Sequence, residues 1–256
     1  MSIALEKALQ PSHPLHDIAQ KVLDGTRIDR ADAIRLYDSN DLITIGALGE
    51  FARKRKAGPG KEKYVYYIHN MHLNPTNFCV ETCRFCSYAN PAEKEKAYTW
   101  SVDRVLEEAR KGAESGINEI HMVGGLNPAC DINYYEGTTI TPNEVLEPSG
   151  YDILKDVAIS RLLLDNFDHI KAYWIQLGEN LAQVAFAFGA DDMDGTIKEE
   201  KITHAAGAKT PLQLAKENLE YLIASAGYQP VERDTLYNIR RIADVAIAEQ
   251  PQLALV

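Results

Sequence analysis

The sequence lacks an excess of basic residues. It has 27 Lys and Arg against 37 Asp and Glu, a formal net charge of -10 and a pI of about 5.2. Because nucleic-acid phosphates require a basic protein surface, this balance predicts that no nucleic acid is a partner. One basic run, ARKRKAGPGKEK at 52–63, has no interleaved aromatic residues. We interpret it as a solvated helix end followed by a linker.

Long apolar segments are absent as well. No window approaches the roughly 20 apolar residues of a membrane span, so we predict no membrane association. The first residues, MSIALEKALQPSHP, carry charges and prolines where a secretory signal needs an apolar core. The composition is 45% hydrophobic and 25% charged, as in soluble globular proteins. We therefore expect a cytoplasmic protein.

Cysteine is scarce, and its four copies are unevenly placed. Cys79, Cys83 and Cys86 follow a C-x3-C-x2-C spacing, and Cys130 stands alone. This pattern does not resemble the paired framework of a small secreted domain. It favours a metal site in a reducing compartment. Cys130 is most simply a small buried residue.

Three thiols narrow the choice of metal. A structural zinc site uses four protein ligands in two short pairs, so His69 or His72 would have to complete it. An iron–sulfur cube normally takes four thiolates. With three, one iron keeps open coordination positions, where a substrate or cofactor can bind. The three-thiol count therefore favours a cluster that takes part in chemistry.

Periodic apolar positions predict helices throughout the first 60 residues. Leu15 to Leu23 show helical spacing before Gly25, a second helix begins near Asp29, and a third runs from Asp41 to the Gly- and Pro-containing segment 56–60. We interpret residues 1–60 as an N-terminal helical cap.

The next segments alternate between strand and helix. Residues 64–69 are aromatic and β-branched, and 117–125 end in two glycines, so both are predicted strands around a helix that Ser101 caps. Such βα order places the loops at one rim. Further elements are predicted as a helix at 151–166, a strand at 170–177, a helix near 179–189, a helix from an N-cap at Thr210 to before Gly227, and a helix at 235–248.

The cysteine loop resembles that of radical S-adenosylmethionine (SAM) enzymes. The resemblance rests on CVETCRFC at 79–86, on Tyr88 two residues after the last cysteine, and on the strand before the first. It implies that Cys79, Cys83 and Cys86 hold a [4Fe-4S] cluster whose open iron binds S-adenosylmethionine. Tyr88 is a candidate cofactor-binding residue.

By the same resemblance, VGGLNP at 123–128 corresponds to the glycine-rich loop that contacts the methionine amino group. Gly124, Gly125 and Asn127 are therefore candidate cofactor-binding residues. Two glycines at a strand end are, by themselves, more often just a turn.

The C-terminal third resembles the aminodeoxyfutalosine synthase family in segments 161–178, 181–211 and 230–238. The cyclase of the same menaquinone pathway and the deazaflavin-forming F420 enzymes are related families. The resemblance implies a transferase that adds the 5'-deoxyadenosyl radical to 3-[(1-carboxyvinyl)oxy]benzoate and forms 6-amino-6-deoxyfutalosine. It also implies a low-potential electron donor such as flavodoxin or ferredoxin.

Candidate donors to the substrate carboxylates are His72, Lys171 and His204. Each has a simpler interpretation, as a backbone partner, a surface lysine and the polar side of a helix. GADDMDGT at 189–196 is not an EF-hand loop, because alanine would occupy the first ligand position. We interpret it as a helix-start turn that carries Asp191 and Asp192.

The expected fold class is α/β, a partial (β/α) barrel of radical SAM type with helical extensions at both ends. Such a barrel has about six strands, and each repeat takes on the order of 30 residues. Only two strands precede Tyr135, and the family pattern resumes at Gly150, so the sequence predicts a barrel shortened at the junction 136–150. The expected regions are the cap at 1–60, the incomplete core at 61–177 and a mainly helical part at 178–256.

Two functional hypotheses follow from this shortening. In one, the chain is a working synthase, completed by a partner chain or by oligomerisation. In the other, it is a shortened relative that binds the iron–sulfur cluster without turnover.

Overall fold

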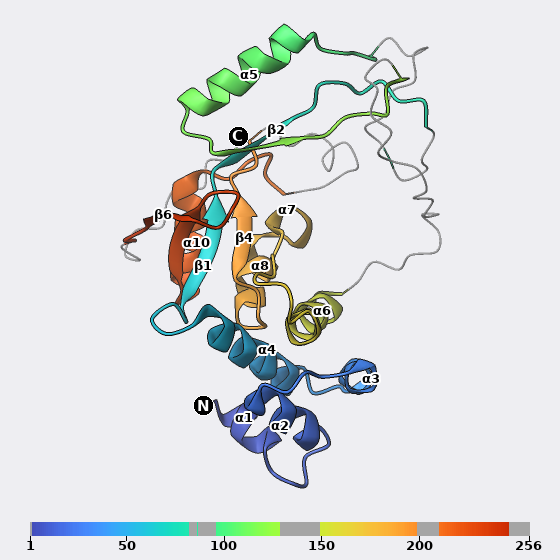
Figure 1. Ribbon diagram of the computed structural model, residues 1–256, viewed down its shortest axis with the longest axis vertical. Helices are drawn as coiled ribbons and strands as arrows, with labels where there is room; N and C mark the ends of the chain where they lie inside the picture. The colour runs from blue at the N-terminus through green and yellow to red at the C-terminus, as the bar shows by residue number, and fades with distance from the viewer. Residues whose placement is uncertain (1, 82–85, 87–95, 129–148, 199–209, 246–256) are drawn as a thin grey trace.

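A central sheet separates a helical base from a projecting arm (Figure 1). The structure, a computed structural model, describes residues 2–81, 86, 96–128, 149–198 and 210–245. Within these ranges no helix combines the length and apolar character needed to cross a membrane.

The helical base contains the three N-terminal helices that the sequence predicts and a short preceding one. The bounds are Ile3–Ala8 for α1, His16–Asp24 for α2, Arg30–Asp38 for α3 and Leu42–Ala57 for α4. Gly25 ends α2 with a φ of 78°, and Asp29 begins α3 in a capping box. Buried apolar residues of α1–α4 pack with those of α6 (Gly150–Leu163), so the cap is attached to the later part of the chain.

The central sheet has the strand order β4-β1-β5-β6. Its strands are β1 (Tyr64–Ile68), β4 (Asp192–Gly195), β5 (Gln229–Arg233) and β6 (Ile239–Ile242). β1 pairs in parallel with β4 and β5, whereas β6 pairs antiparallel to β5. Helices cover one face of the sheet.

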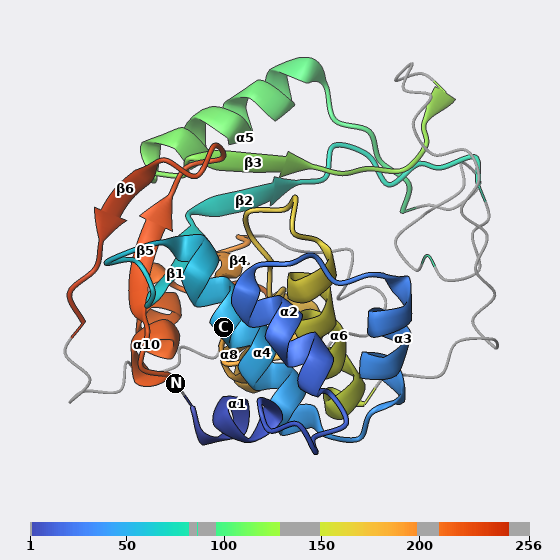
Figure 2. The same cartoon turned by 60° about the horizontal axis from the view of Figure 1, so that its bottom comes forward.

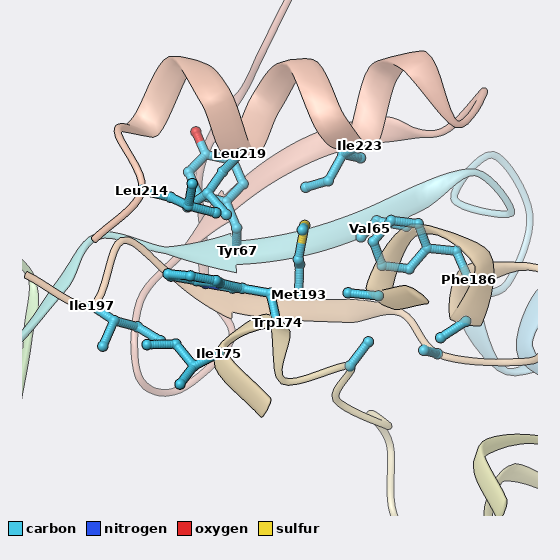
Figure 3. Close-up of a cluster of buried hydrophobic side chains, with 14 of the residues drawn as sticks. Val65, Tyr67, Trp174, Ile175, Phe186, Met193, Ile197, Leu214, Leu219 and Ile223 are labelled. Carbon is cyan, nitrogen blue, oxygen red and sulfur yellow. The ribbon is translucent and has the colours of Figure 1, made fainter. Parts of the chain in front are cut away.

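The covered face forms a hydrophobic core (Figure 3). Val65 and Tyr67 of β1 and Met193 of β4 pack there against Trp174 and against helices α8 (Glu179–Phe186) and α10 (Lys216–Ser225). Since side chains alternate along a strand, the residues between these core positions point to the opposite face. That opposite face carries the polar side chains described below.

The arm continues the line of β1. Beyond His69 the chain forms β2 (Asn70–Leu73), which pairs in parallel with β3 (Glu119–Met122), while α5 (Val102–Glu114) packs beside β2 (Figure 2). The Asn118 side-chain amide donates to the Arg233 carbonyl at 3.4 Å. The start of β3 therefore lies beside the end of β5. This contact links the small sheet to the central one, next to the point where β1 continues into β2. The predicted strands at 64–69 and 117–125 are confirmed.

Two predicted elements near residue 190 are wrong. The predicted strand at 170–177 contains only an isolated bridge from Lys171 to Asp192, followed by the helical turn α7 (Trp174–Leu177). The predicted helix start at 189–196 is instead strand β4. Cationic partners for its buried aspartates outweigh the poor strand propensity of aspartate, and these partners come from distant parts of the chain.

Two helix predictions near the C-terminus also need correction. The helix expected from Thr210 begins at Lys216, although it ends before Gly227 as predicted. The helix expected at 235–248 is wrong, because Asp234 accepts the amides of Leu236 and Asn238 in a turn that leads into β6. Such side-chain bonds to the backbone compete with helix formation. Region 178–256 contains β4, β5 and β6 as well as α8 and α10, and the predicted region boundaries stay predictions.

Candidate active site

The cysteine loop and the glycine loop lie side by side beyond β2 and β3. The amide of Gly125 donates to the Thr76 carbonyl at 2.9 Å, and the amide of Val80 donates to the Leu126 carbonyl at 3.1 Å. The Leu126 amide donates to Cys79 Sγ at 3.2 Å. These hydrogen bonds thus hold Cys79 against the glycine loop.

The two glycines allow this close approach. A Cβ on Gly125 would lie 2.2 Å from the Phe78 carbonyl oxygen, and one on Gly124 would lie 3.0 Å from the Thr76 carbonyl oxygen. Asn127 is buried, and its amide donates to Thr99 Oγ1 at 3.0 Å. These contacts explain all three residues by loop packing, and their predicted contact with S-adenosylmethionine stays a prediction.

Gly125→Ala is expected to destabilise the protein by about 1–3 kcal/mol, because backbone atoms that cannot rotate away would have to separate. Urea unfolding followed by circular dichroism measures this change. Gly150→Ala is the matched control, because its Cβ would meet only Leu181 side-chain carbons at 3.6 and 3.8 Å. Equal unfolding midpoints for the two variants would contradict the packing role of Gly125.

The described thiols fit an iron–sulfur site. Cys79 and Cys86 are free and partly exposed. Hydrogen bonds to ligand sulfurs are typical of iron–sulfur clusters, and Cys79 already accepts one from the Leu126 amide. Cys83, Tyr88, Cys130 and His204 lie outside the described residues.

Beside the loops, the face of the sheets that no described helix covers is rich in polar side chains. The strand registers pair Tyr66 with Asp192, Ile68 with Arg233, and His72 with His121, so these side chains share one face. In a (β/α) barrel the helices cover the outside and this opposite face lines the interior. The polar face is therefore the surface on which a substrate would lie.

A row of three hydrogen-bonded side chains crosses β2 and β3 on this polar face. His72 Nε2 lies 3.3 Å from His121 Nδ1, and His121 Nε2 contacts Glu119 Oε1. The hydrogen bond with His121 lowers the pKa of Glu119 to about 2, although burial opposes the shift. Glu119 is therefore a carboxylate at neutral pH. The structure places His72 on the polar face, and its role as a donor to substrate stays a prediction.

Lys171 reaches the polar face by an ion pair with β4. Its Nζ lies 2.5 Å from Asp194 Oδ1. Asp194 has a φ of 73° at an irregular point in the β1–β4 pairing, and such bulges redirect side chains. Burial raises the pKa of Asp194, while Lys171 acts in the opposite direction. Because Asp194 already offsets the charge of Lys171, the predicted contact of Lys171 with a substrate carboxylate would compete with this pair.

Asp192 and Arg233 form a buried pair across β1. Arg233 Nε lies 2.7 Å from Asp192 Oδ2, and the Tyr237 hydroxyl donates to the same oxygen at 2.6 Å. Asp191, the residue before β4, pairs with Arg161 at 2.5 Å and with His169 at 2.9 Å. The aspartates of 189–196 thus hold the ends of several elements together and do not form a helix start.

Sequence reasoning missed Glu119, His121 and Arg233. The alternating Glu-x-His of the predicted second strand was the available signal for the first two, because residues i and i+2 share a strand face. For Arg233 the sequence offers no comparable signal, since its partner is far away along the chain.

Two sequence families match parts of this chain. The sequence family described as "Radical SAM superfamily" matches residues 73–165, which include the cysteine loop, β3 and most of α6. This segment of the chain is thus a radical SAM domain. A second family, "CofH/MqnC C-terminal region", matches residues 137–246. Radical SAM proteins bind a [4Fe-4S] cluster and S-adenosylmethionine, which are therefore the cofactors, as predicted.

Relatives of this chain include enzymes with different reactions. The chain is 25% identical to an aminodeoxyfutalosine synthase of Thermus thermophilus, over 89% of this chain and 96% of that protein. It is 42% identical over 119 residues to a 5-amino-6-(D-ribitylamino)uracil–L-tyrosine 4-hydroxyphenyl transferase of Methanosarcina barkeri, covering 46% of this chain and 30% of that protein. The relatives of this chain are thus enzymes, but they catalyse different reactions.

The fold agrees with this assignment. The FeFe-hydrogenase maturase HydG from Carboxydothermus hydrogenoformans superposes with a TM-score of 0.62 at 12% identity, over 92% of this chain and 83% of that one. The fold is therefore the α/β, partial-barrel fold of radical SAM proteins. The alignment with the Thermus protein runs over 361 positions, whereas this chain has 256 residues. The relative thus carries residues that this chain lacks, as the predicted shortening requires.

Proposed function

We propose that this chain catalyses the addition of the 5'-deoxyadenosyl radical to 3-[(1-carboxyvinyl)oxy]benzoate, which forms 6-amino-6-deoxyfutalosine for menaquinone biosynthesis. The observation that carries the proposal is the alignment to aminodeoxyfutalosine synthase over 96% of that protein's length. The radical SAM cofactors and the polar face beside the cysteine loop agree with it. We further propose a cytoplasmic location and a flavodoxin or ferredoxin as electron donor.

In this proposal Cys79, Cys83 and Cys86 hold the cluster, which when bound supplies the electron that cleaves S-adenosylmethionine. The chain itself has to bind two substrate carboxylates, orient the double bond and exclude water. His72 and Lys171 are the cationic or donor groups that we assign to the carboxylates, with His204 as a third candidate. Arg233 and Lys171 are both paired with aspartates, but the Arg233 side chain is 3% exposed whereas that of Lys171 is 38% exposed, so Lys171 is the one that a substrate can reach.

Two alternatives have observations of their own. The 42% identity to the Methanosarcina transferase favours a reaction on L-tyrosine and 5-amino-6-(D-ribitylamino)uracil, although it covers less than half of this chain. The missing positions relative to the Thermus protein favour a shortened relative that binds the cluster without turnover. Incomplete enclosure weakens control of a radical, because solvent and other hydrogen donors reach it.

An anaerobic assay distinguishes these possibilities. The cluster is reconstituted, and dithionite and S-adenosylmethionine are added with either enolpyruvyl benzoate or the tyrosine–uracil pair. Formation of 5'-deoxyadenosine, methionine and 6-amino-6-deoxyfutalosine is expected with the first substrate. A product formed only with the tyrosine–uracil pair would assign the chain to the transferase reaction instead. Iron binding without cleavage of S-adenosylmethionine would support the shortened relative that binds the cluster without turnover. Bound zinc without iron would contradict the whole proposal.

A further inference from the structure

A small cavity lies at the start of β1, next to the end of α4 (Figure 1). Its volume is about 210 Å³, several times the roughly 30 Å³ that one water molecule occupies in the liquid. About 20 Å of strand separates Tyr66, which lines this cavity, from the end of β2, which leads into the cysteine loop. The cavity is therefore remote from the cysteine and glycine loops.

Aromatic rings form one wall of the cavity. Tyr66 lies edge-on to Tyr64, with ring centroids 6.4 Å apart, and edge-on to His169, with centroids 5.0 Å apart. All three residues line the cavity. Because aromatic rings attract one another at such distances and angles, this wall favours a ligand that has a ring of its own.

Tyr66 also supplies a donor to the cavity. The residue is only 9% exposed, yet its hydroxyl makes no hydrogen bond within the part of the chain that the structure describes. The hydroxyl of a buried tyrosine usually has a partner. Burial raises the pKa of Tyr66, so the hydroxyl keeps its proton and can donate. An acceptor oxygen of a ligand in the cavity would satisfy it.

The charged side chains around the cavity leave one lysine over. Lys56 lies 3.1 Å from Asp168, and Asp191 is paired with Arg161 at 2.5 Å. Lys61 lines the same cavity and has no acidic partner among the described residues. A single carboxylate group offsets this surplus charge. A phosphate group, which carries close to two negative charges at neutral pH, would exceed it.

We propose that this cavity binds a small aromatic carboxylate, at a site separate from the candidate active site. Lys61 offsets the charge of the carboxylate, and the Tyr66 hydroxyl donates to one of its oxygens. The rings of Tyr64 and His169 contact the ring of the ligand. The inference is independent of the proposed function, because none of these residues is assigned to the cofactors or to the substrate of that reaction.

Benzoate is the probe, and saturation-transfer NMR measures its binding to the full, cluster-loaded chain. We expect saturable binding. Tyr66→Phe keeps the ring and removes only the hydroxyl, and it is expected to weaken binding about tenfold, because a hydrogen bond to a charged group is lost. Lys61→Met is expected to weaken binding about threefold, since this lysine is exposed to solvent.

The matched control is Lys63→Met. Lys63 is an exposed lysine two residues further along the chain, but it does not line the cavity. Its replacement removes the same charge, and the affinity for benzoate is expected to equal that of the unmodified chain. NMR of tyrosine-labelled protein provides a second readout, in which benzoate shifts the ring signals of Tyr64 and Tyr66.

Four results would overturn the inference. Equal affinities of the unmodified chain, Tyr66→Phe and Lys61→Met would show that benzoate does not bind in this cavity. Loss of binding in Lys171→Met alone would place benzoate at the candidate active site and leave the proposed function intact. Acetate that binds as tightly as benzoate would exclude a role for the aromatic wall. Inorganic phosphate that binds more tightly than benzoate would contradict a carboxylate ligand.

Discussion

Cys79→Ser and Cys86→Ser are each expected to abolish stable cluster binding, and with it all cleavage of S-adenosylmethionine. Only three thiolates are available in the C-x3-C-x2-C segment, so the loss of one leaves two protein ligands for a four-iron cluster. Serine keeps the size of the side chain but replaces the soft sulfur ligand. Iron and sulfide per chain, together with the cluster absorbance after anaerobic reconstitution, measure the effect.

Cys130→Ser is the matched control, because this cysteine lies outside the segment. It is expected to keep the iron content of the unmodified chain. If Cys130→Ser lost as much iron as Cys79→Ser, Cys130 would be a fourth ligand and no iron would remain open for S-adenosylmethionine. Retention of a full cluster in Cys79→Ser would remove this cysteine from the ligand set.

Arg233→Met is expected to lower the free energy of unfolding by about 3–5 kcal/mol, because it leaves the buried Asp192 carboxylate without its cation. Asp192 is 0% exposed and lies 2.7 Å from Arg233 Nε. The Tyr237 hydroxyl can still donate to Asp192, but it carries no charge to offset the carboxylate. Urea unfolding measures the change.

The exposed Arg240 on the neighbouring strand supplies the control. Arg240→Met is expected to change stability by less than about 0.5 kcal/mol. The double variant Arg233→Met, Asp192→Asn is expected to lose less than the sum of its single changes, since the buried charge is then gone. Additive losses would show that the two side chains stabilise the sheet independently.

Local signals in the sequence predicted the elements that depend on their own neighbours. Asp29 and Ser101 begin helices because each accepts a backbone amide three residues ahead, and Gly25 ends one because it adopts a left-handed conformation. The resemblance of the cysteine loop to that of radical SAM enzymes predicted the cofactors, because the residues that carry this resemblance are neighbours in the chain. The shortened barrel was also predicted from the sequence, because the junction at 136–150 is too short for one βα repeat of about 30 residues.

Elements stabilised by distant partners were predicted wrongly. Residues 189–196 contain three aspartates in four positions, a composition that disfavours a strand. They form β4 because Arg161, Lys171 and Arg233 pair with them. The expected helix at 235–248 failed for a different reason, since Asp234 closes a local turn that helical periodicity does not reveal.

The sequence by itself determined the family, the cofactors and the positions of the N-terminal helices, because each depends on residues that are neighbours along the chain. Only the tertiary structure decided which polar residues meet. Strand register places His72 opposite His121, and the ion pair with Arg233 orients Asp192 on the same face. Pairing between distant strands leaves no mark on local composition. The register of that pairing nevertheless decides the face, because a shift of one residue would move each of these side chains to the opposite face.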